Sequence, residues 1–409
     1  MQAEIICIGD ELLIGQVVNT NAAWLSRALA DVGLQVTRTV CVADHLAEIE
    51  QAIREAMDRV SWIFMTGGLG PTKDDMTKHA LVKTFGGEMQ FSQETWEHLV
   101  KIYARFDKVA TDAHREQAMI PSLATILFNK MGTAPGLYFN TNDARVFAMP
   151  GVPYEMEFLM GQHILPLIRT YNNRDNVVYR TLATVGEGET FLADRITDIE
   201  EALPDHIHLA YLPSPGRVRL RVTGMSDDPD LVQQVESVTA QILERIAQYV
   251  YATEDIPLAD AIGRTLRAHG RTLTVAESCT GGYLGHLITA IPASSDYFVG
   301  GAITYSNQMK MQLLGVKQET LDKHGAVSEE TVREMSTGAR THFAADYAIA
   351  ISGVAGPTGG TTEKPVGTVW VSVATPNVVV ARRFLFTKDR LRNIELSAIH
   401  ALNLLRMQL

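Results

Sequence analysis

The stretch LTVAESCTGGYLGHL, residues 273–287, runs from an apolar segment through a serine, a cysteine and two glycines into a helical pattern. The apolar part predicts a buried strand and the part after the glycines predicts a helix. Ligands of open α/β sheets bind outside the carboxyl ends of strands, where Ser278 falls. The N–H groups at the start of the helix would suit an anion or an oxyanion.

Two further glycine-rich segments follow predicted strands nearby, VGGAITYSNQMK (299–310) and ISGVAGPTGGTTEKPVG (351–367). Three strand ends of one sheet should converge on one pocket. There Ser278 is a candidate nucleophile and Lys310, with a lowered pKa, a candidate base assisted by the hydroxyl of Tyr305. Cys279 is a rival nucleophile. For each residue alone a structural role is the simpler interpretation, but their convergence on one pocket favours a catalytic role.

The motifs AESCTGG, GGAITYSNQMK, HGAVSEETV, ISGVAGPTGGTTEKPVGTVW and the closing KDR resemble the CinA C-terminal domain, which includes the nicotinamide mononucleotide deamidases. The resemblance implies hydrolysis of the nicotinamide amide to nicotinate mononucleotide and ammonia without a metal. It implies catalysis by Ser278, Tyr305 and Lys310, and a phosphate contact from Arg390. The remaining substrate-binding residues that it implies are Thr280, Gly281, Gly282, Gly301, Gly353, Ala355 and Gly356.

The first 170 residues alternate strand and helix patterns, which predicts a parallel sheet with helices on both faces. GLYFNTNDARVFAMP (136–150) predicts a hairpin with a polar turn. The helix that follows, through residue 171, should bend or break at Pro166. The fold class is therefore α/β: two three-layer α/β domains, 1–170 and 254–409, joined by a small α+β module, 171–253.

The segment FMTGGLGPTKDDMTKHAL (64–81) is another predicted strand that ends in a glycine-rich turn. Its glycine amides could cradle a phosphate, and carboxylates could hold a hard divalent cation. The alternative is a helix N-terminus with two acids that complement its dipole. Asp10 and Glu11 after the first strand, and Gly151 and Glu155 after the last, favour a site.

This segment resembles the MoaB/MogA-like molybdopterin-binding fold in the form found at the N-terminus of CinA proteins, a family linked to ADP-ribose pyrophosphatase activity. A metal flanked by carboxylates would polarise a diphosphate and activate water. The expected metal ligands are Asp75, then Asp74, Asp10 and Glu11. The expected substrate-binding residues are Asn21, Gly67, Gly68, Gly70, Pro71, Thr72, Gly151 and Pro153. Related folds bind pterin cofactors instead.

In the middle module, Arg217, Arg219 and Arg221 alternate with apolar residues along one predicted strand. A solvated strand face is the favoured interpretation, and a phosphate or nucleic-acid contact is the alternative.

The chain has 409 residues and a net charge of −11, which argues against nucleic-acid binding driven by bulk electrostatics. We find no signal peptide and no apolar run long enough to span a membrane. Three scattered cysteines fit a reduced cytoplasm, with Cys7 and Cys41 expected as small buried strand residues.

The combined expectation is a cytoplasmic hydrolase of pyridine-nucleotide salvage that forms a homodimer and binds neither a membrane nor nucleic acid directly. It would act on nicotinamide mononucleotide and ADP-ribose, both products of NAD breakdown. The alternatives are a molybdopterin-type binding protein and a competence or DNA-damage interaction protein.

Overall fold

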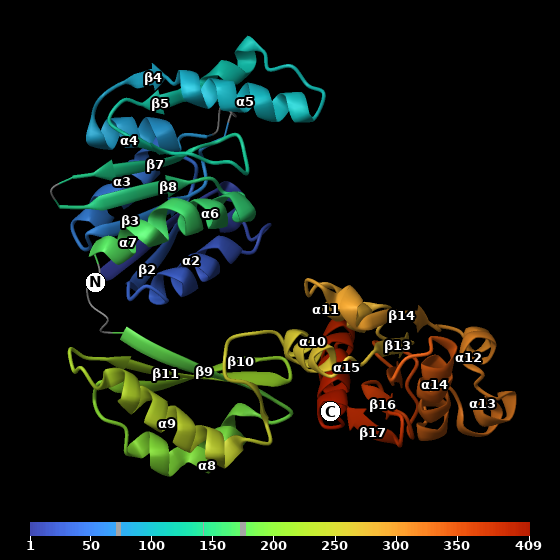
Figure 1. Cartoon of the computed structure of the whole chain (residues 1–409). Coiled ribbons are helices and arrows are strands. Elements are labelled where there is room, and N and C mark those ends of the chain that lie inside the picture. The colour runs from blue at the N-terminus through green and yellow to red at the C-terminus, as the bar shows by residue number, and fades with distance from the viewer. Residues whose placement is uncertain (71–74, 142, 172–176) are drawn as a thin grey trace. The chain divides into compact units, whose positions relative to one another are not determined.

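The computed structural model describes residues 1–70, 75–141, 143–171 and 177–409 (Figure 1). The chain divides into two compact units, Met1–Val177 and Val178–Leu409. Across these described ranges, every helix is too short or too polar to cross a membrane.

A six-stranded sheet forms the centre of the first unit, in the order β2-β1-β3-β8-β7-β6. The first four of these strands are parallel, β7 pairs antiparallel with β8, and β6 pairs antiparallel with β7. The strands are β1 (Gln2–Ile8), β2 (Gln35–Val42), β3 (Trp62–Thr66), β6 (Thr125–Leu127), β7 (Gly136–Asn140) and β8 (Arg145–Met149). The predicted parallel pairing and the β7–β8 hairpin are confirmed.

Helices cover both faces of this sheet (Figure 1). One face packs against α2 (Thr20–Ala30), α6 (Pro153–Leu159) and α7 (Leu165–Tyr171), and the other against α3 (Leu46–Met57) and α4 (Thr77–Phe85). The strand β3 is buried along its whole length, which fits its run of four apolar residues before Thr66. The unit also contains α1 (Asp10–Leu13), α5 (Gln93–Arg105) and the small sheet of β4 (Met89–Phe91) and β5 (Met119–Pro121).

The final helix and Cys41 of this unit differ from the sequence expectations. The final helix continues through Pro166, but a π turn, Met160–Ile164, interrupts its α-helical geometry just before α7, which contains the proline. The expectation for Cys41 is wrong, because this residue is exposed on the edge strand β2, whereas Cys7 is buried on β1 as expected.

The middle module has a four-stranded sheet, in the order β10-β11-β9-β12, with two helices on one face. Its elements are β9 (Val177–Val185), α8 (Glu189–Glu201), β10 (Ile207–Ser214), β11 (Arg217–Met225), α9 (Leu231–Ile246) and β12 (Val250–Ala252).

The three arginines of β11 alternate with buried apolar residues as predicted, but they are half-buried and not fully solvated. Arg219 forms an ion pair with Asp255 at 2.8 Å. The guanidinium of Arg221 lies 5.2 Å from the ring centroid of Tyr179. These contacts support a structural role for the strand face.

The C-terminal part has a five-stranded sheet in the order β14-β13-β15-β16-β17. The strands β14, β13 and β15 are parallel, and β16 and β17 are antiparallel. The strands are β13 (Leu273–Glu277), β14 (Phe298–Ile303), β15 (Tyr347–Gly353), β16 (Thr368–Ala374) and β17 (Val379–Leu385).

Helices cover both faces of this second large sheet as well, which confirms the predicted α/β fold class. One face carries α10 (Leu258–Ala268), α11 (Tyr283–Thr289) and α15 (Arg390–Arg406), and the other α12 (Asn307–Leu314) and α14 (Glu329–His342). The short helix α13 (Gln318–His324) precedes α14 and packs against it.

We expect Gly338→Ala to destabilise the C-terminal part by about 1–3 kcal/mol, because added volume in a packed contact forces the backbone apart. A Cβ atom on Gly338 would lie 1.7 Å from the Leu314 carbonyl oxygen, so α14 could not keep its place against α12. Denaturant unfolding measures the effect, with Thr337→Ala, an exposed change on the same helix, as the control. Equal stability of the two variants would contradict the close approach.

Candidate active sites

In the C-terminal part, the ends of β13 and β14 bring Ser278 and Lys310 together. Lys310 Nζ lies 3.0 Å from Ser278 Oγ and donates a second hydrogen bond to the Thr304 carbonyl at 2.7 Å. The Lys310 side chain comes from α12 and is only 1% exposed. Burial lowers the pKa of Lys310 to about 8. The neutral amine, which can act as a base, is therefore far more populated near neutral pH than for an ordinary lysine.

Glu277, which we did not single out from the sequence, holds the turn that carries Ser278. Its buried carboxylate accepts hydrogen bonds from the N–H groups of Gly282, Leu284 and Gly285 at 3.0, 3.1 and 2.8 Å. The expectation that these N–H groups receive a ligand anion is thus wrong, because the chain supplies its own carboxylate to the positive end of α11. A glutamate at the end of an otherwise apolar strand was the available signal.

The side chain of Tyr305 contacts that of Arg390. The Arg390 guanidinium donates one hydrogen bond to the Tyr305 hydroxyl at 3.0 Å and another to the Gly356 carbonyl at 2.7 Å. Within the described chain, neither Ser278 nor Lys310 has a hydrogen bond to the Tyr305 hydroxyl, and the Tyr305 side chain is 61% exposed. The predicted trio is therefore split into a Ser278–Lys310 pair and a Tyr305–Arg390 pair.

Cys279, the rival nucleophile, is buried beneath the loop. Burial raises the pKa of its thiol to about 12, so the reactive thiolate is disfavoured. Thr280 is also buried, and its hydroxyl has no hydrogen-bond partner among the described residues. This hydroxyl remains available beside Ser278.

The predicted glycines of this site differ in what surrounds them. Gly281 and Gly282 have φ of 61° and 101°, so the turn needs the left-handed conformations that glycine adopts readily. A Cβ at Gly301 or Gly353 would lie within 2.6 Å of a valine methyl on the neighbouring strand, so both permit close strand packing. The carbonyl of Ala355 accepts a hydrogen bond from Asn393, a buried residue on α15.

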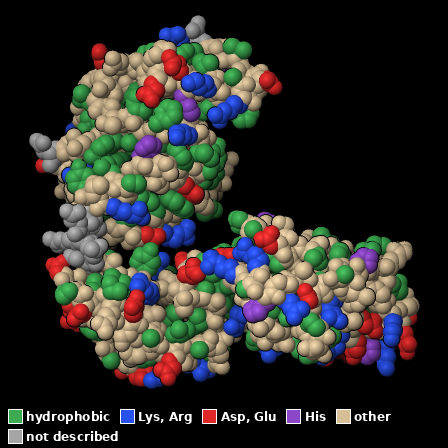
Figure 2. Space-filling view, viewed as in Figure 1, with side chains coloured by type: hydrophobic (Ala, Val, Ile, Leu, Met, Phe, Trp, Pro, Cys, Tyr) green, Lys and Arg blue, Asp and Glu red, His purple; other side chains and the backbone are tan. Residues whose placement is uncertain are grey.

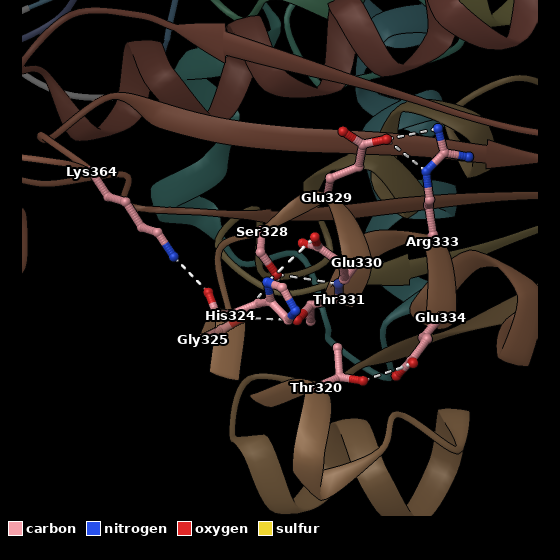
Figure 3. A network of polar contacts seen from close by, with 10 residues as sticks. All are labelled: Thr320, His324, Gly325, Ser328, Glu329, Glu330, Thr331, Arg333, Glu334 and Lys364. Atoms are coloured by element: carbon pink, nitrogen blue, oxygen red, sulfur yellow. Dashed lines mark hydrogen bonds and ion pairs between the residues drawn. The ribbon is translucent and has the colours of Figure 1, made fainter. Parts of the chain in front are cut away.

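The HGAVSEETV motif, residues 324–332, forms a hydrogen-bonded framework at the start of α14 (Figure 3). The side chains of Ser328 and Thr331 both donate to the Gly325 carbonyl, at 3.0 and 2.8 Å. Lys364, from the glycine-rich segment after β15, donates to the His324 carbonyl at 2.6 Å. The motif thus ties the loop after β15 to the start of α14.

In the first unit, the carboxyl ends of four parallel strands surround a cavity of about 560 Å³. It is lined by Gly9, Asp10 and Glu11 after β1, Asp44 after β2, Gly67, Gly68 and Gly70 after β3, and Pro150, Gly151 and Val152 after β8. Further lining comes from Asp75, Thr133 and Glu155. The cavity lies where the order β2-β1-β3 reverses direction, the usual ligand position in such a sheet.

Asp44 joins the predicted carboxylates Asp10, Glu11 and Asp75 in this cavity and was missed from the sequence. Its carboxylate accepts a hydrogen bond from the Met76 N–H at 3.0 Å, and its own N–H donates to Asp10 at 3.2 Å. Burial raises the pKa of Asp44, and the charges of Asp75, Asp10 and Glu11 raise it further. The carboxylates are therefore close enough to repel one another.

A cation would relieve this repulsion, and oxygen ligands of this kind suit a hard divalent ion. In residues 1–70, 75–141, 143–171 and 177–409, however, no three acidic, histidine or cysteine side chains are already arranged around a common metal position. Asp74, Pro71 and Thr72, also predicted for this site, lie outside the described residues.

The remaining predicted residues of this site join the strand ends. Asn21 donates hydrogen bonds to Thr66 Oγ1 at 3.1 Å and to the Gly151 carbonyl at 2.8 Å, which links α2 to the ends of β3 and β8. Gly67 has φ of 110°, and a Cβ on it would lie 2.1 Å from the Ile8 carbonyl oxygen. Pro153 occupies the first turn of α6, where its missing N–H costs nothing.

Comparison with known proteins assigns a family to each part of the chain. Residues 4–170 match the probable molybdopterin binding domain, residues 179–252 the damage-inducible protein CinA KH domain, and residues 255–409 the CinA C-terminal domain.

Full-length relatives agree with these matches. The chain is 40% identical to a CinA-like protein of Cytophaga hutchinsonii over 100% of this chain and 98% of the relative. It is 37% identical to a putative competence-damage inducible protein of Caldicellulosiruptor saccharolyticus over 99% and 98%. The crystal structure of the competence damage-inducible protein A from Klebsiella pneumoniae is 38% identical, covers 37% of this chain and 94% of that chain, and has a TM-score of 0.36. The chain belongs to the CinA family.

Proposed function

We propose that this chain is a bifunctional hydrolase of pyridine nucleotides, with a deamidase site in the C-terminal domain and a metal-dependent diphosphate site in the N-terminal domain. The deamidase proposal rests on one observation, the 3.0 Å contact between Lys310 Nζ and Ser278 Oγ in a buried setting. A serine hydroxyl becomes a useful nucleophile when an adjacent base takes its proton.

In the proposed deamidation, neutral Lys310 accepts the hydroxyl proton while Ser278 Oγ attacks the amide carbon of nicotinamide mononucleotide. Lys310 passes the proton to the amide nitrogen, the C–N bond breaks and ammonia leaves, so that an ester to Ser278 Oγ remains. Water then hydrolyses the ester, which releases nicotinate mononucleotide and restores the hydroxyl. We assign the nucleotide phosphate to Arg390, and Tyr305 orients its guanidinium through their 3.0 Å hydrogen bond.

In the N-terminal domain, the proposed reaction is hydrolysis of ADP-ribose to AMP and ribose 5-phosphate. Asp75, Asp10, Glu11 and Asp44 would hold the divalent cation, which when bound polarises a phosphoryl group and activates water. The glycine-rich end of β3 lets backbone approach the diphosphate closely. The cavity, of about 560 Å³, has room for part of a nucleotide.

A second candidate for this domain is binding of a molybdopterin-type ligand, because its family carries that description. A nucleic-acid partner has less support: the net charge is −11, and basic and acidic side chains are interspersed on the face shown in Figure 2. Product analysis after incubation with nicotinamide mononucleotide and ADP-ribose, with and without a chelator, separates these candidates.

We expect Ser278→Ala to abolish ammonia release from nicotinamide mononucleotide while ADP-ribose hydrolysis continues. The matched control is Cys279→Ala, which removes the neighbouring thiol and should retain deamidation because that thiol is buried and protonated. Ammonia release by the Ser278→Ala protein would exclude Ser278 as nucleophile.

We expect the deamidation rate to rise with pH through a pKa of about 8, because Lys310 can accept a proton only after losing its own. Lys310→Arg should lose activity by about 10²- to 10⁴-fold, since a guanidinium stays protonated. The measurement is kcat/KM against pH, with the exposed Lys323→Met as control. A wild-type pH profile in Lys310→Arg would rule out Lys310 as the base.

We expect a chelator to stop ADP-ribose cleavage and to spare deamidation. Asp75→Asn should mimic the chelator, because the amide keeps the shape but loses the charge that attracts a cation. Asp58→Asn, an exposed change at the end of α3, is the control. Chelator-resistant cleavage by the Asp75→Asn protein would refute the metal assignment, and a wild-type protein inactive with several divalent metals would favour ligand binding.

A further inference from the structure

Glu155 is a buried carboxylate in the N-terminal cavity that the proposed metal site does not use. It lies in the first turn of α6, directly after the end of β8, and its side chain is 7% exposed. It nevertheless lines the same cavity as Asp10, Asp44 and Asp75. A carboxylate so deeply buried requires partners that compensate for its lost hydration.

The protein supplies one such partner, Asn129. The Asn129 amide donates to Glu155 Oε2 at 2.6 Å and to the Ala134 carbonyl at 2.8 Å, and its oxygen accepts from the Met131 N–H at 3.0 Å. The backbone of Gly132 lies against the carboxylate, since a Cβ there would be 2.0 Å from the Glu155 carboxyl carbon. These contacts therefore hold the carboxylate in one position.

One hydrogen bond leaves most of the acceptor capacity of a carboxylate unused, because its two oxygens offer about four acceptor sites. Across the described chain, Asn129 is the hydrogen-bond partner of Glu155, and Oε1 has none. Burial raises the pKa of Glu155, and the bond from Asn129 only partly offsets this effect. Oε1 is therefore an acceptor open to the cavity, where a ligand could donate a hydrogen bond to it.

We propose that Glu155 Oε1 binds a sugar hydroxyl of the nucleotide ligand. Phosphate oxygens are acceptors with negative charge, so a carboxylate repels them, whereas a ribose hydroxyl donates a hydrogen bond. This assignment rests on the proposed ADP-ribose reaction and makes Glu155 a specificity residue. It also separates Glu155 from the four carboxylates assigned to the cation.

The test compares two ligands in Glu155→Gln, at a fixed concentration of the activating metal. ADP-ribose carries sugar hydroxyls and inorganic pyrophosphate carries none. We expect ADP-ribose to bind about tenfold or more weakly than to wild type, since a charge-assisted hydrogen bond is replaced. The dissociation constant of pyrophosphate should stay unchanged. Calorimetry measures both, and Glu157→Gln on the same helix is the control.

Equal affinity of Glu155→Gln and wild type for ADP-ribose would overturn the assignment and leave the proposed hydrolysis standing. A parallel loss of both ligands would also overturn it, because it would indicate a structural or metal-binding role. If Glu155→Gln does not fold, Glu155→Asp serves in its place. This variant keeps the charge but moves it back by one methylene, so it should show the same selective loss of affinity for ADP-ribose. Wild-type protein that neither binds nor cleaves ADP-ribose would remove both proposals, a result visible before any variant is made.

Discussion

Parallel pairing of neighbouring strands is the constraint on which both candidate sites depend. Parallel strands end at the same edge of a sheet, so residues far apart in the sequence meet there. In the C-terminal sheet, β13 and β14 bring Ser278 to within 3.0 Å of Lys310. In the N-terminal sheet, four parallel strand ends enclose one acidic cavity.

The two sites differ in the electrostatic effect that supports their proposed chemistry. Burial of a single amine favours its neutral form, which supports the proposal that Lys310 acts as a base. In the acidic cavity, burial and the charges of Asp75, Asp10 and Glu11 raise the pKa of Asp44, and a cation would relieve this repulsion. The proposed proton transfer thus rests on a desolvated amine, and the proposed metal binding rests on carboxylates that repel one another.

Both sites also depend on groups that hold the reactive residues in place. Glu277 satisfies three N–H groups at the start of α11 and thereby fixes the turn that carries Ser278. Asn21 joins the ends of β3 and β8 beside the acidic cavity. Neither residue performs the proposed chemistry, but each holds in place the strand ends that carry the proposed reactive residues.

The sequence by itself determined the order of strands and helices, the α/β class and the strand ends where the candidate residues lie. These features follow from local periodicity and from glycine-rich turns, which are readable without knowledge of contacts. Only the tertiary structure decided that Asp44 joins the acidic cavity, that Tyr305 contacts Arg390, and that Glu277 occupies the N-terminus of α11. Such partners depend on contacts between segments distant in the chain, and no local pattern around these residues records which neighbour the fold will bring to them.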